Sequence, residues 1–196
     1  PGRGGSIPGN FANVNGTLYF SADDGVHGYE LWKSDGTTAG TVLVKDIQPG
    51  SVGGSPTSIT AAGSTAFFFA DDGVNGRELW KSDGTAAGTV MVKDLRAGSS
   101  GQAATPSMAA LSSSVVLFAG TDGTTIGLYR SDGTAAGTTL VKANSSTLSG
   151  SFVGSATQLT KAGLWDYFSD AIGYLYQSDG TAAGTVLMQN TNSSIT

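Results

Sequence analysis

Several residue types are scarce in this 196-residue chain, and each scarcity excludes a class of chemistry. There is no cysteine, which excludes disulfide bridges and thiolate catalysis, and His27 is the single histidine. One histidine without cysteine cannot assemble a zinc site. Only 13% of the residues are charged, 15 of them acidic and 10 basic, without a run of lysine or arginine. This balance argues against nucleic acid and anionic membranes as partners.

Long apolar runs and helical patterns are also missing. No apolar run approaches the roughly 18 residues of a transmembrane helix. No segment combines a 3.6-residue apolar stripe with capping residues, so we expect little helix. The apolar content of 39% and the low charge nevertheless predict a folded chain rather than a disordered one.

An internal repeat is the strongest signal in the sequence. The octet Ser-Asp-Gly-Thr-(Thr/Ala)-Ala-Gly-Thr occurs four times, at steps of 48, 49 and 47 residues, beginning at Ser34, Ser82, Ser131 and Ser178. Self-similarity at this spacing is typical of repeat architectures. We therefore expect one domain over residues 1–196, built from repeats at about 1–48, 49–96, 97–144 and 145–189 with a tail at 190–196.

Each repeat predicts four short strands. In the second repeat they fall at residues 58–60, 65–70, 77–81 and 89–93. Asp-Gly and Asn-Gly pairs separate such strands because glycine takes positive φ and the Asx side chain supports the turn. Runs such as residues 42–44 are apolar on both faces, which predicts sheets covered on both sides. The predicted fold is all-β, with a four-bladed β-propeller favoured over an open stack.

Two segments carry a resemblance to a known family. ELWKSDGTTAGTVLVKDI at residues 30–47 and ELWKSDGTAAGTVMVKDL at residues 78–95 resemble the ELWxxDGTxxGT repeats of large bacterial and environmental surface proteins. The resemblance implies a β-propeller-like array and an extracellular or cell-surface setting, but no reaction. Residues 127–130 and 174–177 replace Glu-Leu-Trp-Lys with other residues, so the third and fourth repeats depart from this pattern.

The recurring acids are interpreted as structural rather than catalytic. Most carboxylates return with the repeat, whereas a residue needed at one catalytic centre does not have to appear in every repeat. His27 lies in a turn where the second repeat has Asn75, so we expect an exposed turn residue. We therefore predict no catalytic residue and no enzymatic activity. An enzyme would depend on Asp166 or Asp170, the two acids outside the repeat pattern.

Two kinds of ligand remain open. Oxygen-rich turns at Asp23, Asp24, Asp71 and Asp72 are calcium candidates, although Asx-supported hairpin turns are the favoured interpretation and no other cofactor is expected. Aromatic residues at recurring positions are expected to pack between repeats. Trp165 and Tyr167 lie outside the pattern, so Trp165, Asp166 and Tyr167 are the predicted ligand contacts.

The sequence also contains three N-glycosylation sequons. They begin at Asn15, Asn144 and Asn192, and they are glycosylation candidates if the protein is exported to a compartment that glycosylates.

The combined prediction is a non-enzymatic, extracellular structural or adhesive repeat module. The alternative is a carbohydrate-binding β-propeller. The tail segment Asn-Ser-Ser-Ile-Thr at residues 192–196 resembles residues 56–60, a predicted first strand of a repeat. Such a surplus strand can close a ring or pair with another copy, which would give a head-to-tail fibre. The expected partners are other copies of the chain, and glycans in the alternative.

Overall fold

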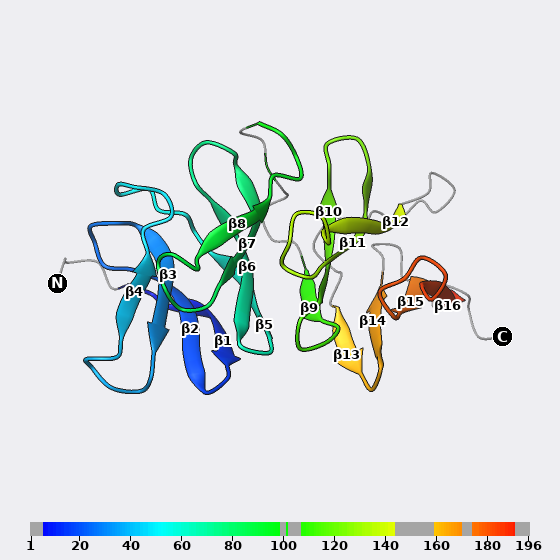
Figure 1. The fold of residues 1–196 in the computed structure, drawn as a ribbon, viewed down its shortest axis with the longest axis horizontal. Helices are drawn as coiled ribbons and strands as arrows, with labels where there is room; N and C mark the ends of the chain where they lie inside the picture. The colour runs from blue at the N-terminus through cyan, green and yellow to red at the C-terminus, as the bar shows by residue number, and fades with distance from the viewer. Residues whose placement is uncertain (1–5, 99–100, 102–106, 144–158, 170–173, 191–196) are drawn as a thin grey trace. The chain divides into compact units, whose positions relative to one another are not determined.

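The computed structural model describes residues 6–98, 101, 107–143, 159–169 and 174–190. These residues form sixteen strands and no helix, and the strands form four antiparallel sheets of four strands each (Figure 1). The all-β prediction with four four-stranded repeats is therefore confirmed. Among the described residues, no helix has the length and hydropathy needed to span a membrane.

The chain divides into two compact units with two sheets each, Pro1–Gln102 and Ala103–Thr196. The strands of the first unit are β1 (Gly9–Val14), β2 (Thr17–Asp23), β3 (Tyr29–Ser34), β4 (Val42–Lys45), β5 (Thr57–Ala62), β6 (Thr65–Asp71), β7 (Arg77–Ser82) and β8 (Val90–Lys93). Those of the second are β9 (Met108–Ala110), β10 (Val116–Thr121), β11 (Ile126–Ser131), β12 (Thr139–Ala143), β13 (Thr160–Ala162), β14 (Trp165–Ser169), β15 (Tyr174–Ser178) and β16 (Val186–Asn190).

Each sheet is a meander in which sequential strands pair. Asn15 and Gly16 connect β1 to β2 with φ values of 51° and 88°, and Val14 pairs directly with Thr17. Two central residues with positive φ are the geometry of a type I′ turn, whose twist matches the strands on either side. The four strands predicted for the second repeat correspond to β5, β6, β7 and β8.

Within each unit the two sheets pack face to face. Each sheet has two faces, which we name by repeat position. The leading face carries the positions that Phe68 and Trp80 occupy in the second sheet. The trailing face is the opposite one and carries the positions that Tyr19 and Leu31 occupy in the first sheet. One buried cluster of the first unit joins trailing-face and leading-face residues, among them Tyr19, Leu31, Val44, Ala66, Phe68 and Trp80. The corresponding cluster of the second unit contains Leu117, Leu128, Val141, Phe168 and Tyr176.

The first strands of neighbouring sheets also meet. β1 lies against β5 in the first unit, and β9 lies against β13 in the second. Contacts between first strands place these strands on the inner side of each sheet pair, with β4, β8, β12 and β16 at the opposite sheet edge.

Coverage on both sides is confirmed for β6 and wrong for β4. Phe67, Phe68 and Phe69 in β6 are all buried, although they point alternately to the two faces. In β4, by contrast, Val42 is 38% exposed and Leu43 is half-buried, and only Val44 is buried. The reason is position: β4 is an edge strand of its sheet, so fewer neighbours cover it.

The recurring aromatic positions of the second and fourth sheets pack between repeats, as predicted. Phe68 pairs with Trp80 across β6 and β7, and the same two positions pair in the other three sheets. The rings of Phe118 and Tyr129 stack with centroids 5.7 Å apart, and those of Phe168 and Tyr176 with centroids 5.2 Å apart. Phe68 and Trp80 belong to the buried cluster between the two sheets of the first unit, and Phe168 and Tyr176 belong to the corresponding cluster of the second unit.

Candidate functional site

The three predicted ligand contacts lie on β14 but not on one face of the sheet. Asp166 pairs with Ser178 and shares the leading face with Phe168, which is part of the core between the third and fourth sheets. Trp165 and Tyr167 alternate with it and lie on the trailing face, where both are half-buried. The structure therefore brings the two aromatic residues together and separates them from Asp166.

Asp166 is a fully buried carboxylate without a hydrogen-bond partner on either oxygen. Burial raises the pKa of Asp166, and the positive charge of Lys161 on the neighbouring strand β13 partly opposes this shift. The Lys161 ammonium itself donates to the carbonyl oxygen of Leu111. Uncompensated burial of a carboxylate is costly, so Asp166 is the outstanding polar anomaly of the described chain.

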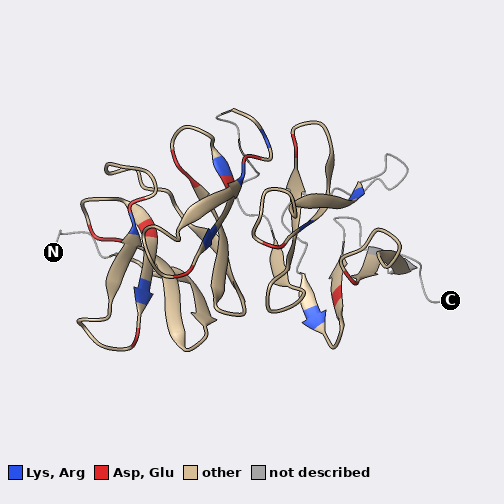
Figure 2. Ribbon diagram, viewed as in Figure 1, with Lys and Arg blue, Asp and Glu red and all other residues tan. Residues whose placement is uncertain are grey.

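The calcium candidates support turns with their carboxylates. Asp23 Oδ1 accepts the Gly25 N–H at 2.6 Å, and Asp71 Oδ1 accepts the Gly73 N–H at 2.7 Å. Figure 2 shows acidic residues in the loops that connect the strands. No group of three acidic or histidine residues that could hold a metal ion occurs among the described residues. A cation at these turns would compete with N–H donors for the same oxygens.

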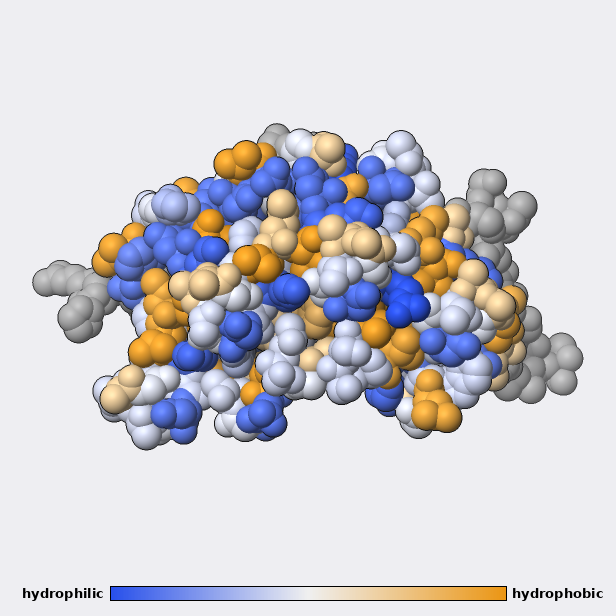
Figure 3. Space-filling view, in the orientation of Figure 1, coloured by the Kyte–Doolittle hydropathy of each residue, from blue (hydrophilic) through white to orange (hydrophobic). Residues whose placement is uncertain are grey.

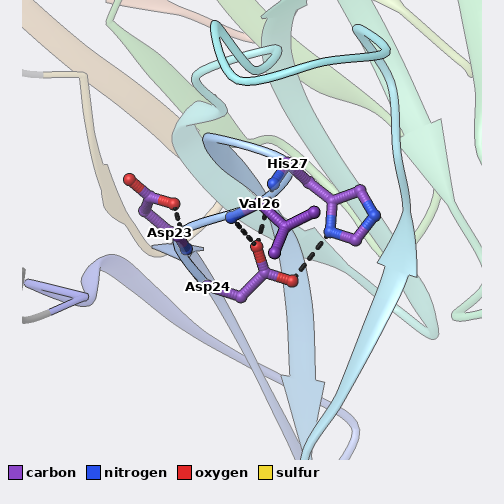
Figure 4. A network of polar contacts seen from close by, with 5 residues as sticks. Asp23, Asp24, Val26 and His27 are labelled. Carbon is purple, nitrogen blue, oxygen red and sulfur yellow. Dashed lines mark hydrogen bonds and ion pairs between the residues drawn. The ribbon is translucent and has the colours of Figure 1, made fainter. Parts of the chain in front are cut away.

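His27 closes one of these turns together with Asp24, as Figure 4 shows. Asp24 Oδ1 accepts the N–H groups of Val26 and His27, and Asp24 Oδ2 lies 2.7 Å from Nδ1 of the His27 ring. The hydrogen bonds from His27 and Val26 lower the pKa of Asp24 to about 2, and the side-chain bond to Asp24 raises the pKa of His27. Asn75 Nδ2 donates to Asp72 in the same way, at 2.7 Å.

The recurring octet forms a self-contained hydrogen-bonded loop. In the second repeat, Asp83 Oδ1 accepts both the N–H and the hydroxyl of Thr85, and Thr85 Oγ1 accepts the Gly88 N–H. Thr89 donates its hydroxyl to the Thr85 carbonyl, and its Oγ1 lies 2.7 Å from Ser82 Oγ. The same bonds recur in the other three loops.

The second glycine of the octet is required by close packing. A Cβ atom built on Gly88 would lie 2.1 Å from Asp83 Oδ1, and the equivalent glycines of the other repeats meet the same conflict. The serine, the aspartate, both threonines and the second glycine of the octet thus each have a structural use. The hydrogen bonds from the threonine also lower the pKa of each octet aspartate: Asp35, Asp83, Asp132 and Asp179.

Glu30 and Glu78 have a role that sequence reasoning missed. The Glu30 carboxylate is buried, and its Oε1 accepts the N–H groups of Gln48 and Gly54 at 3.0 and 2.7 Å. Glu78 similarly accepts the N–H groups of Leu95 and Arg96. These glutamates hold the connection that leaves their sheet rather than a hairpin turn. Burial raises the pKa of Glu30, although the backbone donors oppose the shift.

Lysine contacts between sheets were also missed. Lys45 Nζ donates to the Thr89 carbonyl at 2.8 Å, and Lys142 Nζ donates to the Thr185 carbonyl at 2.8 Å. Lys45 also lies over the Trp80 ring, 5.9 Å from its centroid. The signal in the sequence was the recurrence of lysine at positions 45, 93 and 142, and its replacement by glutamine at position 189.

One glycosylation candidate lies within the described residues. Asn15 is exposed at the tip of the β1–β2 turn, so its side chain is accessible. Asn144 and Asn192 lie outside the described residues, as do Asp170 and the tail at 191–196.

No protein-family model matches the chain, and no curated protein matches it either.

Proposed function

We propose that the protein is a non-enzymatic structural or adhesive repeat module of the extracellular space that associates head to tail with copies of itself. The observation that supports the proposal is that the recurring polar residues of the chain form hydrogen bonds within the fold. The octet aspartates and threonines bond within their own loops, and Glu30 and Glu78 hold the connections between sheets. These polar groups stabilise the loops of the sheets and the connections that follow them, which is the role expected of polar residues in a structural protein.

A stack of similar sheets always has two end faces. In a four-bladed β-propeller, the first and last blades cover each other and close a ring. In a head-to-tail array, each end face is covered by the next copy, which generates a fibre if the rotation does not close. In the proposed array, propeller-like sheets pack against one another within each copy, and the same packing continues from one copy to the next. Closure into a four-bladed propeller is the competing arrangement.

The test is the mass of the purified protein as a function of concentration, by light scattering with size separation. We expect the mass to rise with concentration and electron micrographs to show elongated particles at the highest concentrations. A chain that stays monomeric throughout would contradict self-association and favour the closed ring.

Carbohydrate binding is a second candidate, favoured by the aromatic pair on β14. Trp165 and Tyr167 lie on the same face two residues apart, and both are partly accessible. Aromatic rings of this kind stack on the apolar faces of sugars. A glycan array with the wild-type chain and with Trp165→Ala tests this function. Saturable binding that is lost in Trp165→Ala and kept in Trp32→Phe, the matched tryptophan control, would favour the lectin.

A further inference from the structure

The packing of sheets within each unit follows one rule. The trailing face of one sheet covers the leading face of the next, in the first unit through Tyr19, Leu31 and Val44, and in the second unit through Leu117, Leu128 and Val141. A lysine from the covering sheet donates to the last threonine carbonyl of the octet in the next sheet, as Lys45 and Lys142 do. The rule therefore describes a reusable interface.

Among the described residues, the trailing face of the fourth sheet is more exposed than the equivalent faces of the other sheets. Met188 occupies the position of Val44, Val92 and Val141, which are 6–7% exposed, yet Met188 itself is 51% exposed. Leu175 on the same face is half-buried, whereas its counterparts Leu31, Leu79 and Leu128 are buried. Trp165 and Tyr167 add further apolar area to this face.

The leading face of the first sheet also exposes apolar residues, and it is the type of face that a trailing face covers inside the units. Leu18 is 39% exposed, while its counterparts Ala66 and Val116 are completely buried. Phe11 is 61% exposed and lies beside Phe20, with 6.1 Å between ring centroids. Figure 3 shows apolar residues at the surface interspersed with hydrophilic ones, so exposure alone does not distinguish these faces. Their distinguishing property is that equivalent residues elsewhere in the chain are buried.

We propose that the trailing face of the fourth sheet packs on the leading face of the first sheet of a second copy. This inference rests on the proposed head-to-tail association and names the surfaces that carry it. Each of the two open faces is of the type that, inside the units, is covered by a face of the other type, so the contact between copies continues the contact between sheets. Met188 and Leu175 then pack against Leu18, Phe20 and Trp32 of the next copy.

The junction between copies is weaker than the interfaces inside the units. Lys33 and Lys45 donate to carbonyls of the second sheet at 2.8 Å each. The fourth repeat has Gln177 and Gln189 at these two positions, so the two charge-assisted hydrogen bonds are missing from the junction. Association should therefore be reversible and should depend on concentration, while each chain stays folded.

Single charged substitutions on exposed residues test the proposal. Met188→Asp places a carboxylate on the trailing face of the fourth sheet, and Leu18→Asp places one on the leading face of the first. Leu187→Asp is the matched control, because Leu187 is 48% exposed beside Met188 but pairs with Tyr176 on the other face. Circular dichroism checks that each variant is folded, and Met188→Ala and Leu18→Ala provide milder changes at the same sites.

The decisive measurement mixes the two blocked variants. Met188→Asp and Leu18→Asp should each remain monomeric at concentrations where the wild type and Leu187→Asp associate. Their equimolar mixture should form dimers and nothing larger, because each partner retains one intact face. Association of the single variants equal to that of the wild type would overturn the assignment of faces but leave self-association standing. A mixture that stays monomeric also overturns it, and a monomeric wild type overturns the proposed association itself.

Discussion

Asp166 stands where the other repeats have apolar residues. Leu18, Ala66 and Val116 occupy the equivalent position, each opposite the first serine of its octet. In the folded protein the Asp166 carboxylate is buried without a partner, which raises its pKa. We predict that Asp166→Val increases the free energy of unfolding at pH 7 by about 1–3 kcal/mol, the usual penalty of a buried unsatisfied polar group. Urea denaturation of the full chain measures it.

The pH dependence provides the control for this prediction. A carboxyl group whose pKa is raised by folding destabilises the protein once the pH exceeds its unfolded pKa of about 3.9. The advantage of Asp166→Val should therefore shrink as the pH falls below about 4 and the unfolded chain also becomes protonated. Val116→Asp, at the same position of the third repeat, should show the mirror-image loss. Equal stability of Asp166→Val and wild type at pH 7 would contradict the prediction.

The Asp24–His27 contact affects the titration of His27, which can be measured directly. Asp24 raises the pKa of His27, so the contact stabilises the fold at pH values below the ordinary histidine pKa of about 6.5 and loses this effect as pH rises through the raised pKa. An NMR titration should give a midpoint above that of a free histidine. Asp24→Asn should return it toward the free value, whereas Asp23→Asn should not, because Asp23 accepts from Gly25. An unchanged midpoint in Asp24→Asn would contradict this interpretation.

At the scale of the element, the octet loop depends on the close approach of Asp83 to Gly88. Gly88→Ala forces the carboxylate away and breaks its bonds to Thr85. We expect a loss of about 1 kcal/mol of stability, comparable to the loss of a helix-capping side chain. In the background of Asp83→Ala the same change should cost less, because the conflicting carboxylate is gone. Ala87→Ser, one residue earlier in an exposed position, is the control, and strictly additive effects would refute the mechanism.

The strands were predictable because their signals are local. Asx-Gly pairs mark turns through backbone conformation alone, so the four strands of the second repeat followed from neighbouring residues. The partners of Glu30 were not predictable, since they lie 18 and 24 residues further along the chain. The burial of Asp166 was not predictable either, because an acid outside the repeat pattern is usually solvated.

Across the whole chain, the repeat predicted the number of sheets but not which sheet faces are exposed. Met188 and Val141 occupy the same repeat position, and the residues around them in the sequence give no reason for their different exposure. Val141 packs in a buried cluster with Phe168 and Tyr176 of the fourth sheet, whereas Met188 is 51% exposed. The difference depends on which sheet packs against each position, and a repeated residue pattern does not contain that information.

Lysine contacts between sheets give a prediction for each compact unit. Lys45→Met keeps an apolar stem but removes the hydrogen bond to Thr89 and the contact with Trp80. We expect a loss of about 1.5–3 kcal/mol, the range of a hydrogen bond with a charged partner. Trp32 and Trp80 belong to the first unit and Trp165 to the second, so tryptophan fluorescence distinguishes the two.

The measurement is urea denaturation in two reporter backgrounds. In Trp165→Phe, the remaining signal comes from the first unit, and Lys45→Met should lower its midpoint. In the double variant Trp32→Phe and Trp80→Phe, the signal comes from the second unit, and Lys142→Met should lower that midpoint by removing the bond to Thr185. Because each lysine joins the two sheets of its own unit, the shift should be largest in the matching reporter. A Lys45→Met variant that leaves the first-unit midpoint unchanged would show that these ammonium contacts do not stabilise the packing of neighbouring sheets.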